Sequence, residues 1–174
     1  GALFLGAPLG LACATYLAEY AGKKRKLFLK PALELLAGIP SVLYGFLGLI
    51  YIVPLVRNYL GGSGFSIIST SIVLGVMILP TVISISYDAI TSVPRAYREG
   101  SLAMGSTKWQ TIYKVVIPSA KSGILASFIL GMGRAIGETM AVIMVAGNAL
   151  KIPTSVLDPL RTLTSNIALE LAYA

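Results

Sequence analysis

The sequence predicts an all-α integral membrane protein, and three observations lead to this fold class. Hydrophobic residues make up 56% of the 174 residues and charged residues only 12%, with a mean hydropathy of +0.82. The apolar residues gather in runs long enough for membrane-spanning helices, which need about 20 residues each. The basic residues lie between these runs instead of on one surface. A water-soluble globular domain does not fit this pattern.

Four apolar segments are expected to cross the membrane, with approximate bounds 1–21, 31–56, 65–88 and 121–147. In the first, Gly6 and Gly10 would let another helix approach closely. In the second, Gly38 and Pro40 interrupt the helix, and because freed backbone groups are tolerated only where protein covers them, this segment should face inward.

The last segment, 148–174, is too polar to span a bilayer and is expected to lie outside. The chain opens on Gly1 already within an apolar run, so we expect an internal piece of a longer polypeptide. Residues 1–174 are therefore predicted to form one transmembrane domain.

The basic residues set the predicted orientation. Two loops hold ten of the 14 Lys and Arg residues: Lys23, Lys24, Arg25, Lys26, Lys30, Arg95, Arg98, Lys108, Lys114 and Lys121. Three lie in the other two connecting segments, and Arg134 lies within a span. The positive-inside rule makes the ten-residue side cytoplasmic, in a multi-pass protein of the cell (inner or plasma) membrane. The net charge of +7 thus reflects topology and not nucleic-acid binding, and recognition of anionic lipid is a compatible alternative for the 23–26 cluster.

Several kinds of chemistry are excluded by the residues that the chain lacks. There is no histidine, which removes histidine-based metal sites and catalytic triads, and Cys13 is the single cysteine. Residues 100–107 have the glycine spacing of a phosphate-binding loop, but Ser106 replaces its lysine and no strand precedes it. We therefore expect no metal site, no catalytic residue and no ATP site on this chain, and an intramembrane enzyme has little support.

The longest polar interval is the loop formed by residues 91–120, which is expected to form two short helices. Gly105 supplies a left-handed stop for the first helix. Thr107 followed three residues later by Gln110 fits a capping box that starts the second helix, and Pro118 is expected to end it.

Within this loop, Glu99, Gly105 and Pro118 stand at the spacings of the signature E-A-A-x3-G-x9-I-x-L-P, so the loop resembles the EAA loop of bacterial ABC-importer permeases. Small residues replace the two alanines, and the aliphatic pair before the proline is changed conservatively. The resemblance implies a MetI-like permease core whose cytoplasmic coupling helices dock on an ATP-hydrolysing subunit. It makes Glu99, Gly105 and Pro118 the candidate docking residues, and an amphipathic linker on the membrane surface is the alternative.

Arg134 and Glu138 lie at the centre of the fourth predicted span, four residues apart and on one helix face. Arg134 is about 20 Å from either end of the span, too far for its side chain to reach water. Each charge there costs roughly 2.5–3.5 kcal/mol and needs a partner or a wet cavity. A guanidinium beside the bare backbone of Gly133 and Gly137 suits an oxyanion, and a self-neutralising structural pair is the alternative.

The run from Gly133 to Asn148 resembles the permease of phosphate ABC importers of the PstC type. The resemblance implies that Arg134 and Glu138 line the path of phosphate. It also implies a second homologous permease subunit, two cytoplasmic ATPase subunits that carry ATP and Mg²⁺, an external phosphate-binding protein and surrounding membrane lipid. Sulfate or molybdate remains an alternative cargo, and a secondary anion transporter is a further alternative, which would predict an inverted repeat.

Overall fold

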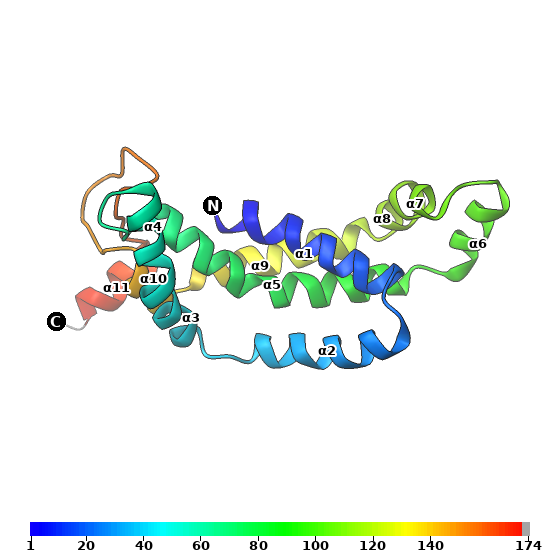
Figure 1. Cartoon of the computed structure of the whole chain (residues 1–174), viewed down its shortest axis with the longest axis horizontal. Coiled ribbons are helices and arrows are strands. Elements are labelled where there is room, and N and C mark those ends of the chain that lie inside the picture. The colour runs from blue at the N-terminus through cyan, green and yellow to red at the C-terminus, as the bar shows by residue number, and fades with distance from the viewer. Residues whose placement is uncertain (172–174) are drawn as a thin grey trace. The chain divides into compact units, whose positions relative to one another are not determined.

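The computed structural model describes residues 1–171, which fold into helices with no β-strand in that range (Figure 1). The helices are α1 (Ala2–Glu19), α2 (Lys23–Ala37), α3 (Ser41–Leu47), α4 (Val53–Leu60), α5 (Ile67–Ser92), α6 (Arg95–Ala103), α7 (Lys108–Thr111), α8 (Ile117–Ser119), α9 (Lys121–Gly137), α10 (Met140–Val145) and α11 (Leu163–Leu171). Two π-helical turns, η1 (Gly48–Ile52) and η2 (Ile112–Val116), join α3 to α4 and α7 to α8. The all-α prediction is confirmed.

Three helical runs in the described part of the chain are long and apolar enough to cross a membrane: Ala2–Glu19, Ser41–Leu60 and Ile67–Ser92. A fourth results if the bent pair Lys108–Ser119 and Lys121–Gly137, at 68° to one another, is counted as one broken span. The first and third runs fall where spans 1–21 and 65–88 were predicted. The other two predicted spans differ from the structure.

The predicted span 31–56 is wrong in its bounds. Helix α2 begins at Lys23 and contains Pro31, and the chain then breaks before Ser41. The cause lies in Pro40, whose ring disfavours helical backbone in the residue before it, so α2 ends at Ala37 and α3 starts afresh after an extended Pro40. The membrane-length helix therefore runs over Ser41–Leu60.

The predicted continuous span 121–147 is also wrong, because α9 ends at Gly137 and α10 begins at Met140. Glycine is a weak helix former, and Gly137 ends α9, with Gly133 four residues before it. The side chain of Glu138 accepts a hydrogen bond from the backbone N–H of Ala141 at 3.1 Å, which supports the new helix start.

Pro118 does not end the second helix of the 91–120 loop, contrary to the sequence prediction. The wider turn η2 precedes it, with the N–H of Ile117 bonded to the carbonyl of Ile112, and Pro118, which has no N–H, follows within α8. The helix ends one residue later, at Ser119, and the 68° bend to α9 follows.

The described chain divides into two compact units. The first contains Gly1–Gly6, Gly38–Ile78 and the chain from Met132, and the second contains Ala7–Ala37 and Leu79–Gly131. Helices α1, α5 and α9 each contribute residues to both units.

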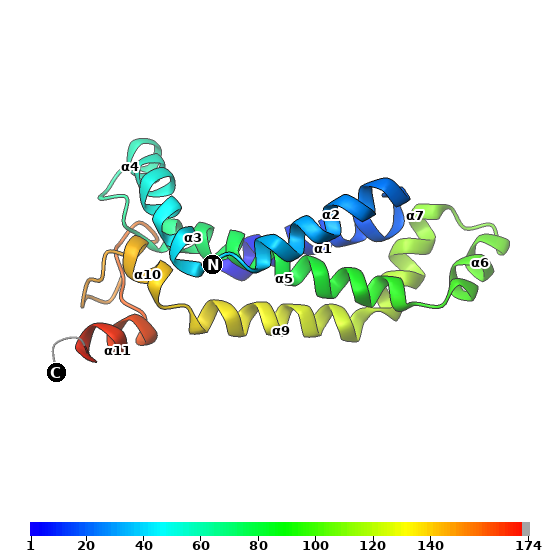
Figure 2. The ribbon, with the colours of Figure 1, turned by 90° about the horizontal axis from the view of Figure 1, so that it is seen from below.

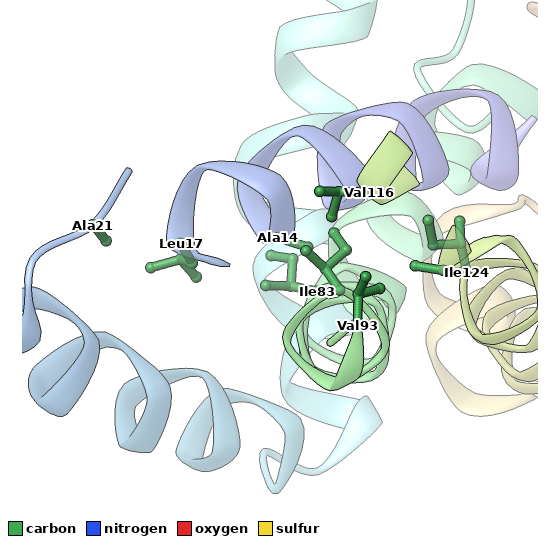
Figure 3. Packing of buried hydrophobic residues seen from close by; sticks show 9 residues of the cluster. Ala14, Leu17, Ala21, Ile83, Val93, Val116 and Ile124 are labelled. Carbon is green, nitrogen blue, oxygen red and sulfur yellow. The ribbon is translucent and has the colours of Figure 1, made fainter. Parts of the chain in front are cut away.

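In the second unit, buried side chains from α1, α5, η2 and α9 form one hydrophobic cluster, and Figure 3 shows several of them gathered around α5. Its buried members are Ala14, Leu17, Ala21, Ile83, Ile90, Val93, Val116, Ala120 and Ile124. Gly10 brings α1 close to α5, since a Cβ atom there would lie 2.6 Å from Val82. Ser86 and Ser127 add a buried hydroxyl pair at 2.8 Å between α5 and α9.

In the first unit, α3 and α10 pack closely. A Cβ atom at Gly45 would lie 2.7 Å from the Cα atom of Ala141, so only glycine permits this approach. At Gly48 an added Cβ atom would lie 2.5 Å from Val73 and 3.0 Å from Val145. Gly45 and Gly48 therefore face inward, as the sequence predicted, whereas Gly38 and Pro40, at the interruption itself, are exposed.

The segment after α10 is a loop stabilised by hydrogen bonds within it and by bonds from the backbone N–H groups of Ile67 and Ile68 to its carbonyls. Gly147 forms an isolated parallel bridge with Leu160. The carboxylate of Asp158 accepts hydrogen bonds from the backbone N–H groups of Thr154 at 2.8 Å and Ser155 at 2.9 Å, and these bonds lower its pKa. Helix α11 follows, and residues 172–174 of the predicted external segment lie outside the described residues.

Candidate functional site

The 91–120 loop folds as the two-helix unit that its sequence predicts (Figure 2). Gly105 ends α6 with a φ of +85°, the left-handed conformation that favours glycine. Thr107 and Gln110 form a complete capping box at the start of α7. A hydrogen bond of 3.0 Å between the Ser101 and Thr111 hydroxyls ties α6 to the end of α7.

Arg98 anchors the loop to the rest of the second unit. Its Nε and Nη2 atoms donate to Oε1 of Glu19, at 3.0 and 2.7 Å. Nη1 donates to the carbonyl of Val93 at 2.6 Å, and Nη2 donates also to that of Ile90 at 2.8 Å. The guanidinium therefore joins α6 to the carboxyl-terminal ends of α1 and α5.

This anchor is shielded from water, because only 20% of the Arg98 side chain and 11% of the Glu19 side chain are exposed. Sequence reasoning missed the pair, which is separated by 79 positions. One signal was present, since Glu19 is the single charged residue of the predicted span 1–21, and a carboxylate in an apolar span requires a partner.

Lys108 provides a second attachment, from α7. Its Nζ atom donates to the backbone carbonyl of Glu19 at 2.8 Å and lies 4.5 Å from the ring centroid of Tyr20. A cation is favoured at this position because the last carbonyls of α1 carry partial negative charge. Both short helices of the loop are thus hydrogen-bonded to the end of α1.

The loop also has a set of exposed residues, several of them apolar. The predicted docking residues Glu99 and Pro118 are exposed, as is Gly105 between the two helices. Large apolar side chains are exposed beside them: Tyr97, Leu102, Met104, Trp109 and Tyr113. Such a concentration of exposed apolar groups on a polar loop is typical of a protein-binding surface.

Arg134 and Glu138 lie in the first unit, at the break between α9 and α10. Arg134 stands in the last turn of α9, whereas Glu138 follows the end of that helix and binds the first turn of α10. The prediction that both project from one face of a continuous helix is therefore wrong. Arg134 therefore belongs to α9, whereas Glu138 is hydrogen-bonded to α10.

The break is accessible and is surrounded by helix ends. Cβ atoms added at Gly133 and Gly137 would meet no atom within 4 Å, so the backbone beside Arg134 borders open space. Thr164, at the start of α11, donates its hydroxyl to the carbonyl of Glu138 at 3.0 Å. Non-helical backbone at membrane depth is tolerated where protein covers it or where it lines a wet cavity.

The arrangement places a guanidinium beside accessible backbone at a helix break. A guanidinium offers a planar set of donors that matches oxyanions in two-point contacts. Among residues 1–171, no group of three or more Cys, Asp or Glu side chains is placed to hold a metal ion. The fold and the two sites define a multi-pass helical membrane protein with a polar helix break and an exposed two-helix loop, the architecture of a permease.

Comparison with known proteins identifies its family. The model described as "Binding-protein-dependent transport system inner membrane component" matches residues 6–168, so the chain belongs to that family of inner-membrane permeases. It is 48% identical over 170 residues to the probable ABC transporter permease protein YqgH of Bacillus subtilis, covering 97% of this chain and 55% of that protein.

Similar matches come from proteins named for phosphate transport. The chain is 34% identical to the phosphate transport system permease protein PstC of Pasteurella multocida, covering 97% of this chain and 59% of that protein. It is 32% identical to the probable PstC protein of Methanocaldococcus jannaschii, with 99% and 60% coverage. The chain thus spans between half and two thirds of the length of these relatives.

Proposed function

We propose that this chain is the membrane-spanning translocation subunit of an ATP-driven importer of inorganic phosphate. Support comes from the family membership and from the PstC relatives, which align with nearly the whole chain. The observation that carries the choice of an anion is Arg134, which stands in the last helical turn before a break bordered by open space. Sulfate and molybdate are the alternative cargoes, because tetrahedral oxyanions present similar oxygen geometry.

In this proposal, ATP is hydrolysed on two cytoplasmic partner subunits, and this chain itself carries no cofactor. The exposed apolar side of the 91–120 loop docks on the ATPase, with Glu99, Gly105 and Pro118 in the docking segment. Movement of the docked loop reaches α1 and α5 through the hydrogen bonds of Arg98. A second homologous permease subunit completes the pathway, and an external binding protein delivers phosphate.

The role of Arg134 can be tested by substitution in the full-length, assembled complex. Arg134→Lys keeps the charge but loses the two-point donor geometry, so uptake of labelled phosphate into proteoliposomes should fall at least tenfold while assembly persists. Arg57→Lys is the matched control, because Arg57 is an exposed arginine on α4. It should transport normally. Competition with sulfate and molybdate in the same assay identifies the cargo.

The double variant Arg134→Gln/Glu138→Gln separates transport from structure. If the two residues only neutralise one another, removal of both charges leaves transport intact, because an uncharged pair is tolerated in apolar surroundings. Normal phosphate uptake by this assembled variant would disprove a pathway role. Loss of uptake with normal assembly supports it.

A further inference from the structure

A groove in the second unit has no part in the proposed transport site. It lies between α2 and the end of α5, with a volume of about 380 Å³. Three lysines of α2 line it, Lys23, Lys26 and Lys30, together with Tyr87 of α5. Leu27 and Pro31 supply an apolar wall beside the ammonium groups.

Two of the lysines are held in place over the aromatic ring. Nζ of Lys26 donates to the carbonyl of Ala18 at 2.8 Å and lies 6.0 Å from the ring centroid of Tyr87. Nζ of Lys30 lies 3.2 Å from a carboxylate oxygen of Asp88 and 5.4 Å from the same ring centroid. An ammonium group has three N–H donors, so these fixed groups keep donors for a further acceptor.

The charge of the groove favours an anion. Its three ammonium groups face two carboxylates, Glu34 in the lining and Asp88 at Lys30. Lys24 and Arg25, next to the groove on the same helix, add two further positive charges. Four consecutive basic residues thus occupy the first turn of α2, where the helix dipole disfavours cations. A bound anion would offset this repulsion.

The apolar half of α2 identifies the kind of anion. No residue of α2 is buried, and Leu27 and Phe28 are 80% and 77% exposed. A free phosphate ion would use only the ammonium groups, whereas a phospholipid also places acyl chains against such side chains. Basic grooves beside membrane helices bind anionic headgroups in this way.

We infer that the groove formed by Lys23, Lys26, Lys30 and Tyr87 binds the phosphate headgroup of an anionic phospholipid, with its acyl chains along Leu27 and Phe28. The lipid joins α2 to the end of α5 by neutralising ammonium groups that otherwise repel one another. The inference does not depend on which anion the protein transports, because it requires only that the protein lies in a membrane.

The test measures binding of phosphatidylglycerol to the full-length, delipidated permease by native mass spectrometry, with phosphatidylcholine, a zwitterion without net charge, as the comparison. The groove variant is Lys23→Gln/Lys30→Gln, which retains the structural bond of Lys26. The control is Lys24→Gln/Arg25→Gln, which removes the same charge from the same helix but lies outside the groove lining. Circular dichroism verifies that both variants keep their helices.

We expect the groove variant to lose roughly 30-fold in phosphatidylglycerol affinity, about what two lysines contribute near a lipid surface. The control should lose less than about threefold, because its charges act only from a distance. Equal losses of phosphatidylglycerol affinity in the two variants would show that the lipid is attracted by the overall charge of the helix, and would overturn the inference. So would equal binding of phosphatidylcholine to the unaltered protein.

Two further measurements exclude other causes. Asp88→Asn breaks the Lys30 ion pair but retains the ammonium group, so phosphatidylglycerol affinity should stay equal or rise. A fall as large as that of the groove variant would assign the effect to the ion pair and refute a headgroup site. Displacement of phosphatidylglycerol by excess inorganic phosphate would likewise refute it, because the groove would then be a site for free phosphate.

Discussion

Replacing Arg98 by alanine should release the 91–120 loop from the helices that hold it. The change removes both hydrogen bonds to the Glu19 carboxylate and leaves that group, 11% exposed, without its guanidinium partner. It also removes the donor that serves the carbonyls of Ile90 and Val93 at the end of α5.

The expected magnitude follows from this shielding. Removing one partner of a buried ion pair costs about 3–5 kcal/mol, because the remaining charge stays desolvated. Glu19→Gln should cost less, about 1–2 kcal/mol, since a neutral amide still accepts hydrogen bonds but without charge assistance. If the 3–5 kcal/mol lost in Arg98→Ala is what holds α6 in place, the fraction of molecules with α6 detached rises by roughly two to three and a half powers of ten.

Hydrogen–deuterium exchange of the full-length permease measures this opening. Amides of α6 and α7 should exchange faster in the Arg98 variant, while those of α10, in the other unit, serve as the internal reference. Arg95→Ala is the matched control, because Arg95 is an exposed arginine of the same helix. Exchange of α6 in Arg98→Ala at the rate of Arg95→Ala would refute the anchoring role.

Two further changes test local features. Gly105→Ala places a side chain at a φ of +85° with no atom in reach, so backbone strain alone should cost about 1–2 kcal/mol and reduce co-purification of the ATPase subunit. Gly100→Ala, at an equally open but helical position, should leave co-purification unchanged, and equal losses in both would argue against the turn. Asp158 has a lowered pKa, so its contribution to the loop after α10 is complete above the ordinary value of 3.8 and is lost as the pH falls through the lower folded value. Asp158→Asn should therefore speed amide exchange at Thr154 and Ser155 at neutral pH, and unchanged exchange would contradict this role.

The sequence predicted local features well and long-range ones poorly. The turn at Gly105 and the capping box of Thr107 depend on residues three or four positions apart, and both are present. The partnership of Arg98 with Glu19 bridges 79 positions, and no local pattern encodes it. Such pairs form only when the tertiary fold brings the two residues together.

The two misplaced spans have a common cause. Hydropathy averages over a window and therefore joins apolar segments across a short break. At Ile39 and Pro40 the break follows from proline sterics, and a proline was visible in the sequence. At Glu138 the break depends on a carboxylate that binds the next helix, and the i, i+4 spacing from Arg134 favoured a continuous helix instead.

The division of α1, α5 and α9 between two units constrains how the protein assembles. Ala2 packs in one cluster with Val142 and Ala146, about 140 positions later, so this cluster cannot close until nearly the whole stretch has been synthesised. In water, such delayed burial would leave apolar surface exposed to aggregation. In a bilayer, lipid chains cover the same surface until its partner arrives. The membrane thus permits a topology of high contact order that a soluble domain of this size would fold slowly.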